Sequence, residues 1–157
     1  MIIRLIAIGK TDSRELQNLI ADYSKRLSHY IRFETDIIPD IKNAKNLSEN
    51  QQKEKEGELI LSKITAADTL ILLDENGKEF SSVAFSQELQ KRMNSGIKTL
   101  VFIIGGPYGF SDAVYSRANG KISLSQMTFS HQMVRLFFIE QLYRAFTIIR
   151  NEPYHHQ

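Results

Sequence analysis

The chain has 157 residues, of which 42% are hydrophobic and 24% charged, and it contains no cysteine. This length matches one ordinary domain, and the composition excludes disordered, collagen-like and rod-like proteins. The lack of cysteine excludes disulfide frameworks, zinc ribbons, iron–sulfur clusters and thiolate nucleophiles. A formal net charge of +2 permits nucleic acid as a partner without arguing for it. We expect a single domain over residues 1–157.

No apolar stretch of the sequence approaches the roughly 20 residues that span a bilayer. The apolar opening, residues 1–9, is interrupted by Arg4 and shows no signal-peptide cleavage pattern. We therefore expect a cytoplasmic protein that does not enter a membrane.

Short β-branched runs alternate with longer helical patterns along the chain, which is typical of an α/β sheet. Strands are predicted at residues 2–8, 33–38, 69–73, 99–104 and 121–124. Helices are predicted at residues 13–27 and 83–93, in a short segment capped by Ser111, and at residues 131–150. Residues 40–58 contain few apolar side chains and predict a loop that leads into an exposed helix through residue 64. Residues 74–77 predict a turn.

The final predicted helix is apolar over most of its circumference. Its polar positions form one narrow stripe, made of Glu140, Arg144, Thr147 and Asn151. Such a helix must be covered on more than one side, and a chain this short has few elements that can do so. The pattern favours a homodimer built on this helix. The alternative is a central helix of a monomer.

Two strand ends carry the best local signal for a ligand site. One strand runs directly into Gly105-Gly106-Pro107, and an earlier one ends at Leu72-Leu73-Asp74. In open parallel sheets, ligands bind beyond the carboxyl ends of strands, where glycines let the backbone approach closely. Neither a dinucleotide fingerprint nor a P-loop is present. If the two ends are neighbours, they frame an apolar crevice that suits an uncharged flat ring better than a row of phosphates.

Other catalytic constellations are scarce in the sequence. It contains no serine elbow of the G-x-S-x-G type and no H-E-x-x-H motif. His131, His155 and His156 are candidate metal ligands, but paired histidines near a chain terminus are usually solvated, and we expect no metal site. Glu140 and Arg144, four residues apart on a helix, indicate a structural ion pair.

Several short motifs occur in order behind the opening strand. They are Leu73-Asp74 with Gly77-Lys78, Ile104-Gly105-Gly106-Pro107-x-Gly109, Leu124-Ser125-x-Met127-Thr128-Phe129, His131, Leu142-Tyr143-Arg144-Ala145 and Asn151-x-Pro153-Tyr154-His155. Together they closely resemble the ribosomal RNA large subunit methyltransferase H family, the pseudouridine N3-methyltransferases of the SPOUT class. The resemblance covers essentially the whole chain.

This resemblance implies a SPOUT fold, in which helices sandwich a parallel sheet and a trefoil knot near the C-terminus forms the S-adenosylmethionine pocket. It implies that a homodimer methylates N3 of a pseudouridine in 23S ribosomal RNA, within the large subunit or the whole ribosome. The cofactor contacts that it implies are Leu73, Gly105, Leu124, Ser125, Gln126, Met127, Thr128 and Phe129.

The family uses an arginine of its last helix and a Tyr-His tail at the RNA site, and the corresponding residues here are Arg144, Tyr154 and His155. We expect Arg144 to hold a phosphate or to stabilise negative charge on a deprotonated base. We expect Pro153 to end the helix, so that the tail folds back towards the crevice. Relatives tend to carry a basic residue after the Tyr-His pair. Here His156 and then Gln157 follow, which weakens the expected phosphate contact.

Two hypotheses from other classes remain open. A non-catalytic RNA-binding module of the ribosome would need a broader basic face than this sequence provides. A flavodoxin-like or nucleotide-binding oxidoreductase would need a phosphate-binding loop, which is missing. Titration with S-adenosylmethionine against NAD, flavin mononucleotide and ATP separates the enzyme hypotheses.

Overall fold

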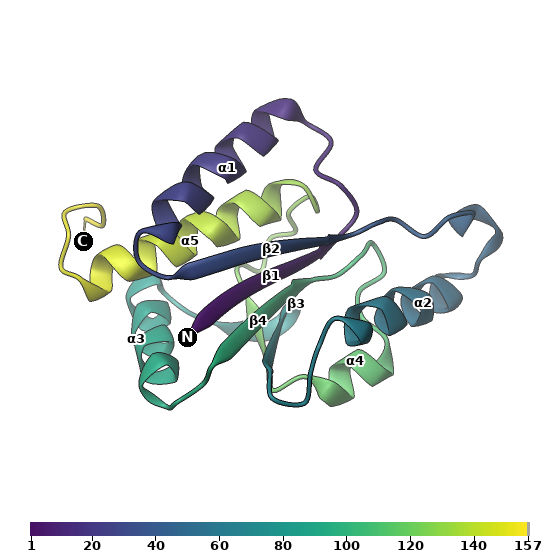
Figure 1. The fold of residues 1–157 in the computed structure, drawn as a ribbon. Helices are drawn as coiled ribbons and strands as arrows, with labels where there is room; N and C mark the ends of the chain where they lie inside the picture. The colour runs from purple at the N-terminus through teal and green to yellow at the C-terminus, as the bar shows by residue number, and fades with distance from the viewer. Residues whose placement is uncertain (157) are drawn as a thin grey trace.

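A five-stranded parallel sheet forms the centre of the protein (Figure 1), as seen in a computed structural model that describes residues 1–156. All four strand pairings are parallel, and the order across the sheet is β2-β1-β4-β3-β5. The strands are β1 (Ile2–Ile8), β2 (Arg32–Ile38), β3 (Thr69–Glu79), β4 (Thr99–Ile104) and β5 (Gly120–Ser123). The predicted α/β class is confirmed.

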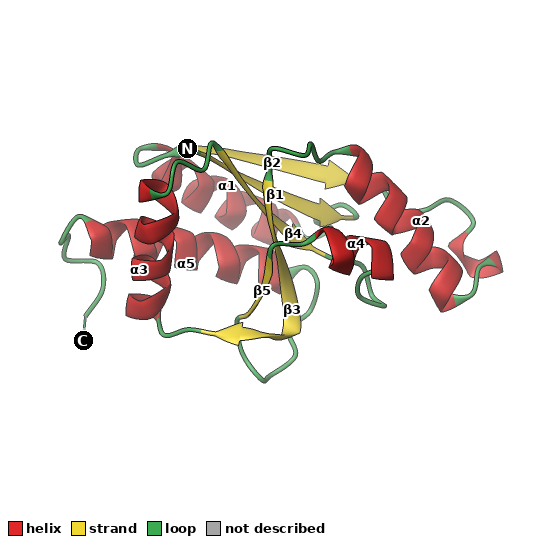
Figure 2. Ribbon diagram, turned by 90° about the horizontal axis from the view of Figure 1, so that it is seen from below, coloured by secondary structure: helices red, strands yellow, loops and turns green. Residues whose placement is uncertain are grey.

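Helices cover both faces of this sheet (Figure 2). Helices α1, α3 and α5 pack on one face, and α2 and α4 pack on the other. They are α1 (Arg14–Ser28), α2 (Glu49–Ser62), α3 (Ser82–Asn94), α4 (Asp112–Arg117) and α5 (Met133–Ile149), with a 3-10 turn at Ala44–Asn46. The predicted sandwich is therefore confirmed, whereas the trefoil knot stays a prediction.

A serine begins each of the first four α-helices. The side chain of this serine accepts a hydrogen bond from the backbone amide three residues later, which satisfies one of the free N–H groups of the first turn. The capping residues are Ser13, Ser48, Ser81 and Ser111. These caps fix where each helix starts after its loop, including the short helix that Ser111 was predicted to cap.

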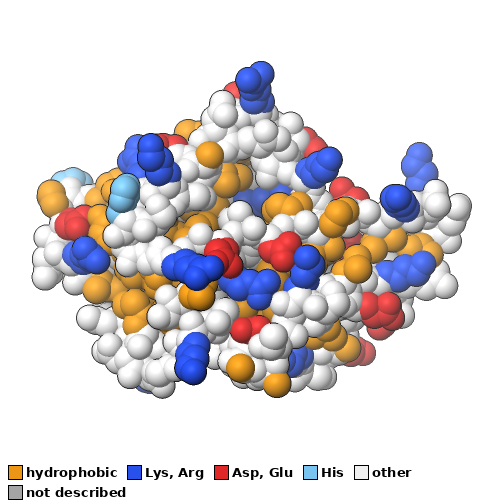
Figure 3. All heavy atoms as spheres, in the orientation of Figure 1, with side chains coloured by type: hydrophobic (Ala, Val, Ile, Leu, Met, Phe, Trp, Pro, Cys, Tyr) orange, Lys and Arg blue, Asp and Glu red, His pale blue; other side chains and the backbone are white. Residues whose placement is uncertain are grey.

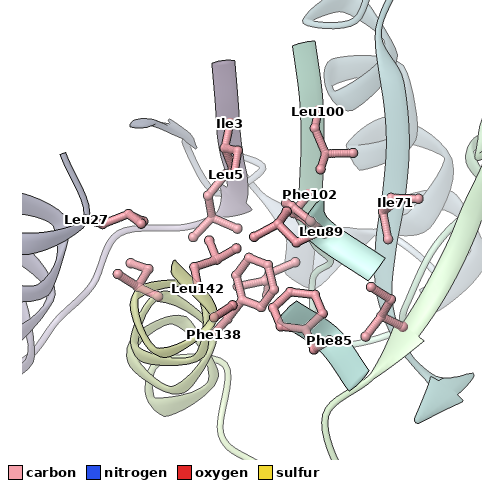
Figure 4. Close-up of a cluster of buried hydrophobic side chains, with 14 of the residues drawn as sticks. Ile3, Leu5, Leu27, Ile71, Phe85, Leu89, Leu100, Phe102, Phe138 and Leu142 are labelled. Carbon is pink, nitrogen blue, oxygen red and sulfur yellow. The ribbon is translucent and has the colours of Figure 1, made fainter. Parts of the chain in front are cut away.

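The strands are apolar on both sides because both faces of the sheet are covered. Along β1, Ile3 and Leu5 point to the face of α5, and Ile6 and Ile8 point to the face of α2. Each face of the sheet therefore carries a cluster of buried apolar side chains. The cluster on the face of α5 includes Phe102 and Phe138, whose ring centroids lie 4.7 Å apart (Figure 4). The two buried clusters hold the central strands in place from both sides.

Strand β3 is longer than the sequence indicates. In place of the predicted turn at residues 74–77, the strand continues to Glu79, with a register shift against β5 between Leu73 and Lys78. A Cβ built at Gly77 would lie 2.5 Å from the backbone carbon of Ile122. Glycine here lets β5 approach the bulged strand closely.

Helix α2 is exposed over most of its surface, as its polar sequence predicts, but it begins at Glu49, inside the predicted loop, and one side of it is buried. The buried residues are Glu56, Gly57 and Ile60. A Cβ built at Gly57 would lie 2.3 Å from Ser111 Oγ, so a missing side chain lets α2 settle against the start of α4. This contact depends on the small size of Gly57 and not on apolar side chains, so the hydrophobic pattern of the sequence does not predict it.

Helix α5 is covered within one chain more completely than expected. Thr147, which the sequence places in the polar stripe, is fully buried, and its hydroxyl donates to the backbone oxygen of Arg144 at 2.7 Å. The predicted stripe is therefore wrong at this position. Apolar side chains still reach the surface at Met133 and Phe137, the latter 39% exposed. They lie in the first half of the helix.

The last helix also ends earlier than predicted, at Ile149. Asn151 adopts a left-handed conformation, with φ of 55°, and such a residue commonly terminates a helix. The prediction that Pro153 ends the helix is wrong, because the chain has already turned. Among the residues described, no helix is long and apolar enough to cross a membrane.

Candidate functional site

A cavity of about 460 Å³ lies beyond the carboxyl end of β4 and beside the irregular middle of β3, at residues 74–76. Leu73 of β3 pairs with Ile104 of β4, so this part of β3 and the loop that follows β4 line the cavity together. The prediction that Leu73-Asp74 and the Gly105-Gly106 turn frame a crevice is confirmed, although β3 does not end there. The cavity volume falls within the range of about 300–1,000 Å³ that is typical of small-molecule sites.

The segment that follows β5 forms the remaining wall of this cavity, which we call the strand-end cavity. Local hydrogen bonds shape the segment: Ser123 Oγ donates to the backbone oxygen of Ser125, and the Met127 amide donates to Ser125 Oγ. The structure thereby brings together every residue expected to contact the cofactor, namely Leu73, Gly105, Leu124, Ser125, Gln126, Met127, Thr128 and Phe129.

Glycines form the loop between β4 and α4 because side chains would not fit there. A Cβ at Gly105 would lie 3.0 Å from the Phe110 ring, and one at Gly106 would lie 2.4 Å from Glu56 Oε2. Glu56 is 3% exposed, and its Oε2 atom has no hydrogen-bond partner. Burial raises the pKa of this carboxyl. One side of this loop therefore packs against Glu56 of α2, and the other side lines the cavity.

The ionised groups that line the strand-end cavity are acidic. Asp74 and Glu75 lie in its wall, and no Lys or Arg occurs among the described lining residues. Tyr115 donates to Asp74 Oδ2 at 2.5 Å, and burial together with this bond raises the pKa of the phenol to about 12. A site without cations does not suit a phosphate, in agreement with the missing P-loop.

The cavity also touches the start of α5, where His131 and Val134 line it. Behind them, Arg135 is 3% exposed and donates to the backbone oxygens of His131, Ile8 and Gly9. Neither this arginine nor Tyr115 is among the site residues predicted from the sequence. The available signal for Arg135 was a lone cation in an apolar stretch of helix.

The three residues expected at the RNA site also lie together. Arg144 contacts Glu140 at 2.6 Å and His155 Nδ1 at 3.2 Å, and its guanidinium lies 4.7 Å from the centre of the Tyr154 ring. The Tyr154 hydroxyl donates to Glu140 at 3.0 Å. The hydrogen bond that Arg144 donates to Glu140 raises the pKa of Arg144, and burial raises that of Tyr154. We call these four residues the tail cluster.

The tail cluster does not line the strand-end cavity of its own chain. The tail folds back onto α5 as expected, but it meets Arg144 and Glu140 rather than the crevice (Figure 1). Val134, which lines the cavity, precedes Arg144 by ten residues, or about 15 Å of helix. Gln157, the last residue of the predicted tail, lies outside the described residues.

A second, separate cavity of about 390 Å³ lies between the strand-end cavity and the tail cluster. It shares Leu124 and Phe129 with the strand-end cavity and reaches Glu140 of the tail cluster. Phe80 and the exposed Phe137 line it as well. Within the described chain, no group of three His, Asp or Glu side chains is placed to hold a metal ion.

The fold and its strand-end cavity define a class of protein. The family model described as a predicted SPOUT methyltransferase matches residues 1–155, and the chain belongs to this family. A solved structure of the SpoU methyltransferase AviRb from Streptomyces viridochromogenes, in complex with AdoMet, has a TM-score of 0.48 and 12% identity. That similarity covers 96% of this chain and 59% of the other, and it says nothing about individual residues.

Within this class, curated relatives match along the whole chain. Proteins named ribosomal RNA large subunit methyltransferase H are 78% identical in Flavobacterium johnsoniae, 80% in Flavobacterium psychrophilum and 64% in Parabacteroides distasonis. Each match spans 157 residues and 100% of both chains. The resemblance found in the motifs is confirmed, and the chain is a member of the ribosomal RNA large subunit methyltransferase H family.

Proposed function

We propose that this protein transfers a methyl group from S-adenosylmethionine to N3 of a pseudouridine in 23S ribosomal RNA, on the assembled ribosome. The observation that carries the proposal is the convergence of all eight expected cofactor residues on one cavity. The relatives' name, ribosomal RNA large subunit methyltransferase H, supports the RNA class. We also propose that the protein acts in the cytoplasm, which fits a ribosomal substrate, and that residues 1–157 act as a single domain.

The strand-end cavity fits this cofactor. Its walls combine apolar side chains such as Leu73 and Leu124 with backbone of the glycine loop, a combination that can hold adenine without phosphate contacts. The cofactor supplies an electrophilic methyl group. The chain's contribution is to bind it, to exclude water and to place the accepting base in line.

The tail cluster has the chemistry for the RNA side of the reaction. Arg144 can hold a phosphate or stabilise the negative charge that forms when N3 loses its proton. The ring of Tyr154 can stack on a base, and His155 can donate to a carbonyl or phosphate. Glu140 holds Arg144 and Tyr154 in one arrangement, so this set is ordered before RNA arrives.

A homodimer resolves the separation of these two sites. The tail cluster lies about 15 Å along α5 from its own cavity, whereas methyl transfer requires contact between base and cofactor. We propose that a second copy packs on the exposed apolar side chains Met133 and Phe137, and brings its own tail cluster to the cavity of the first. Light scattering should give about twice the chain's mass at micromolar concentration.

The rival RNA-binding module finds less support. On the face drawn in Figure 3, Lys and Arg side chains are interspersed with Asp and Glu and form no continuous basic surface. A module that only binds RNA depends on such a surface. A module of this kind also does not require a cavity, and the Asp and Glu side chains in the wall of the strand-end cavity would repel RNA phosphates.

Transfer of tritium from labelled S-adenosylmethionine to purified ribosomes tests the proposal, with free 23S RNA as the comparison. We expect label at a pseudouridine of the assembled ribosome. Deletion of residues 154–157, or Arg144→Ala, should lower transfer at least about a hundredfold and leave cofactor binding intact, because positioning of the base is lost. Arg14→Ala, at an exposed position, is the matched control. Full activity of the truncated chain would show that the RNA site does not include residues 154–157.

A further inference from the structure

The proposed cofactor pocket contains an acidic group that the sequence analysis did not assign. Asp74 follows Leu73 in β3, and its side chain is half-buried in the wall of the strand-end cavity. The Tyr115 hydroxyl donates to Oδ2, and the backbone amide of Asn76 donates to Oδ1 at 2.8 Å. Two donors therefore fix this carboxylate from two sides.

This anchoring leaves the carboxylate capable of binding a ligand. Each carboxylate oxygen accepts about two hydrogen bonds, so both oxygens of Asp74 keep acceptor capacity. The neighbouring Glu75 is exposed and adds a second negative charge. Lys121 Nζ lies 5.5 Å from the centre of the Tyr115 ring, and Lys121 does not line this cavity. The Asp and Glu side chains of this wall are therefore not offset by a Lys or Arg among the described lining residues.

S-adenosylmethionine carries a net positive charge, because its sulfonium and ammonium outweigh its carboxylate. Methyl transfer breaks the bond from sulfur to methyl, and the electron pair stays on sulfur. The new bond forms from N3, whose proton passes to solvent water. The cofactor product is then a neutral thioether, and the net positive charge is lost. A fixed carboxylate in the pocket would bind these two states unequally.

We propose that Asp74 is a specificity-determining residue, whose anchored carboxylate favours S-adenosylmethionine over its demethylated product by sensing the charge that methyl transfer removes. This inference rests on the proposed function, since it concerns the same pocket. As a consequence, methyl transfer lowers the affinity of the pocket for the cofactor product, S-adenosylhomocysteine. Tyr115 acts through Asp74 as a positioning residue.

Calorimetry with three ligands tests the inference: S-adenosylmethionine, S-adenosylhomocysteine and methylthioadenosine, which lacks both the sulfonium and the amino acid. Asp74→Asn keeps the shape and removes the charge. We expect it to weaken S-adenosylmethionine about tenfold, the lower end of what a hydrogen bond to a charged group contributes. The preference over S-adenosylhomocysteine should fall at least about threefold, and methylthioadenosine should change less than about twofold. Glu79→Gln, on the same strand but outside the cavity, is the matched control.

Parallel losses for all three ligands would overturn the inference, because Asp74 would then contact the nucleoside. An unchanged affinity for S-adenosylmethionine, or an unchanged preference over S-adenosylhomocysteine, would overturn it as well. The wild-type chain gives a check without any variant: added salt should weaken S-adenosylmethionine more than methylthioadenosine, and equal salt dependence contradicts the inference. If the wild-type chain binds none of the three ligands, the proposed function itself fails, an outcome distinct from failure at Asp74.

Discussion

Replacing Arg135 with Met should destabilise the protein by roughly 3 kcal/mol. The guanidinium is buried and donates to three backbone oxygens, those of Ile8, Gly9 and His131, at 2.7 to 3.1 Å. Methionine fills similar space but leaves these oxygens without a donor, at a cost of about 1 kcal/mol each, the low end for a buried unsatisfied group. For a chain of this size, the melting temperature should fall by about 6–12 °C.

Urea unfolding followed by circular dichroism measures this change, with the slope expected to stay constant while the midpoint moves. Arg14→Met, at an exposed position in the first turn of α1, should change stability by less than about 0.5 kcal/mol. Burial lowers the pKa of Arg135, which shows that its charge is costly to hold there. A midpoint within error of wild type would show that this cost cancels the hydrogen bonds, and would refute the reasoning.

Burial raises the pKa of the Glu56 carboxyl. The folded state therefore keeps the carboxyl proton to higher pH than the unfolded state, and the free energy of unfolding falls as the pH rises through the ordinary carboxyl range. Glu56→Gln should therefore resist urea better than wild type at about pH 7 and lose that advantage at about pH 4. An equal difference in stability between variant and wild type at the two pH values would contradict this prediction. Gly106→Ala places a Cβ 2.4 Å from Glu56 Oε2, and it should cost about 1–3 kcal/mol of stability and weaken S-adenosylmethionine binding in calorimetry. Unchanged stability and affinity would show that Glu56 does not constrain this loop. Phe137→Asp should leave the fold intact but halve the mass measured by light scattering; a dimer mass would place the contact away from α5.

The sequence predicts the elements well where the information is local. The apolar run of β4 and the capping position of Ser111 each fix a boundary without reference to the rest of the chain. The sequence also predicts that Leu73 and Gly105 line one crevice on the condition that their strands are neighbours, and the pairing of Leu73 with Ile104 meets that condition. The segment at residues 124–129 entered only through the family resemblance.

The failures share a physical cause, which is contact between residues far apart in the chain. Burial of Glu56 depends on the glycine loop, and β3 extends past the predicted turn because Gly77 admits Ile122. Arg135 is acceptable in the interior because carbonyl groups more than 120 residues away accept its hydrogen bonds. No periodicity in a single segment carries such information.

The strand order has a consequence for how the chain reaches this fold. Strand β1 lies inside the sheet and pairs with β4, which the ribosome makes roughly 100 residues later, or about 5–20 s at ordinary rates of synthesis. Until then one edge of an apolar strand has no partner, and such edges promote aggregation. Pairings this distant also slow folding, since loop closure precedes any gain from contact. The nascent chain therefore passes through a long interval in which a chaperone can protect β1.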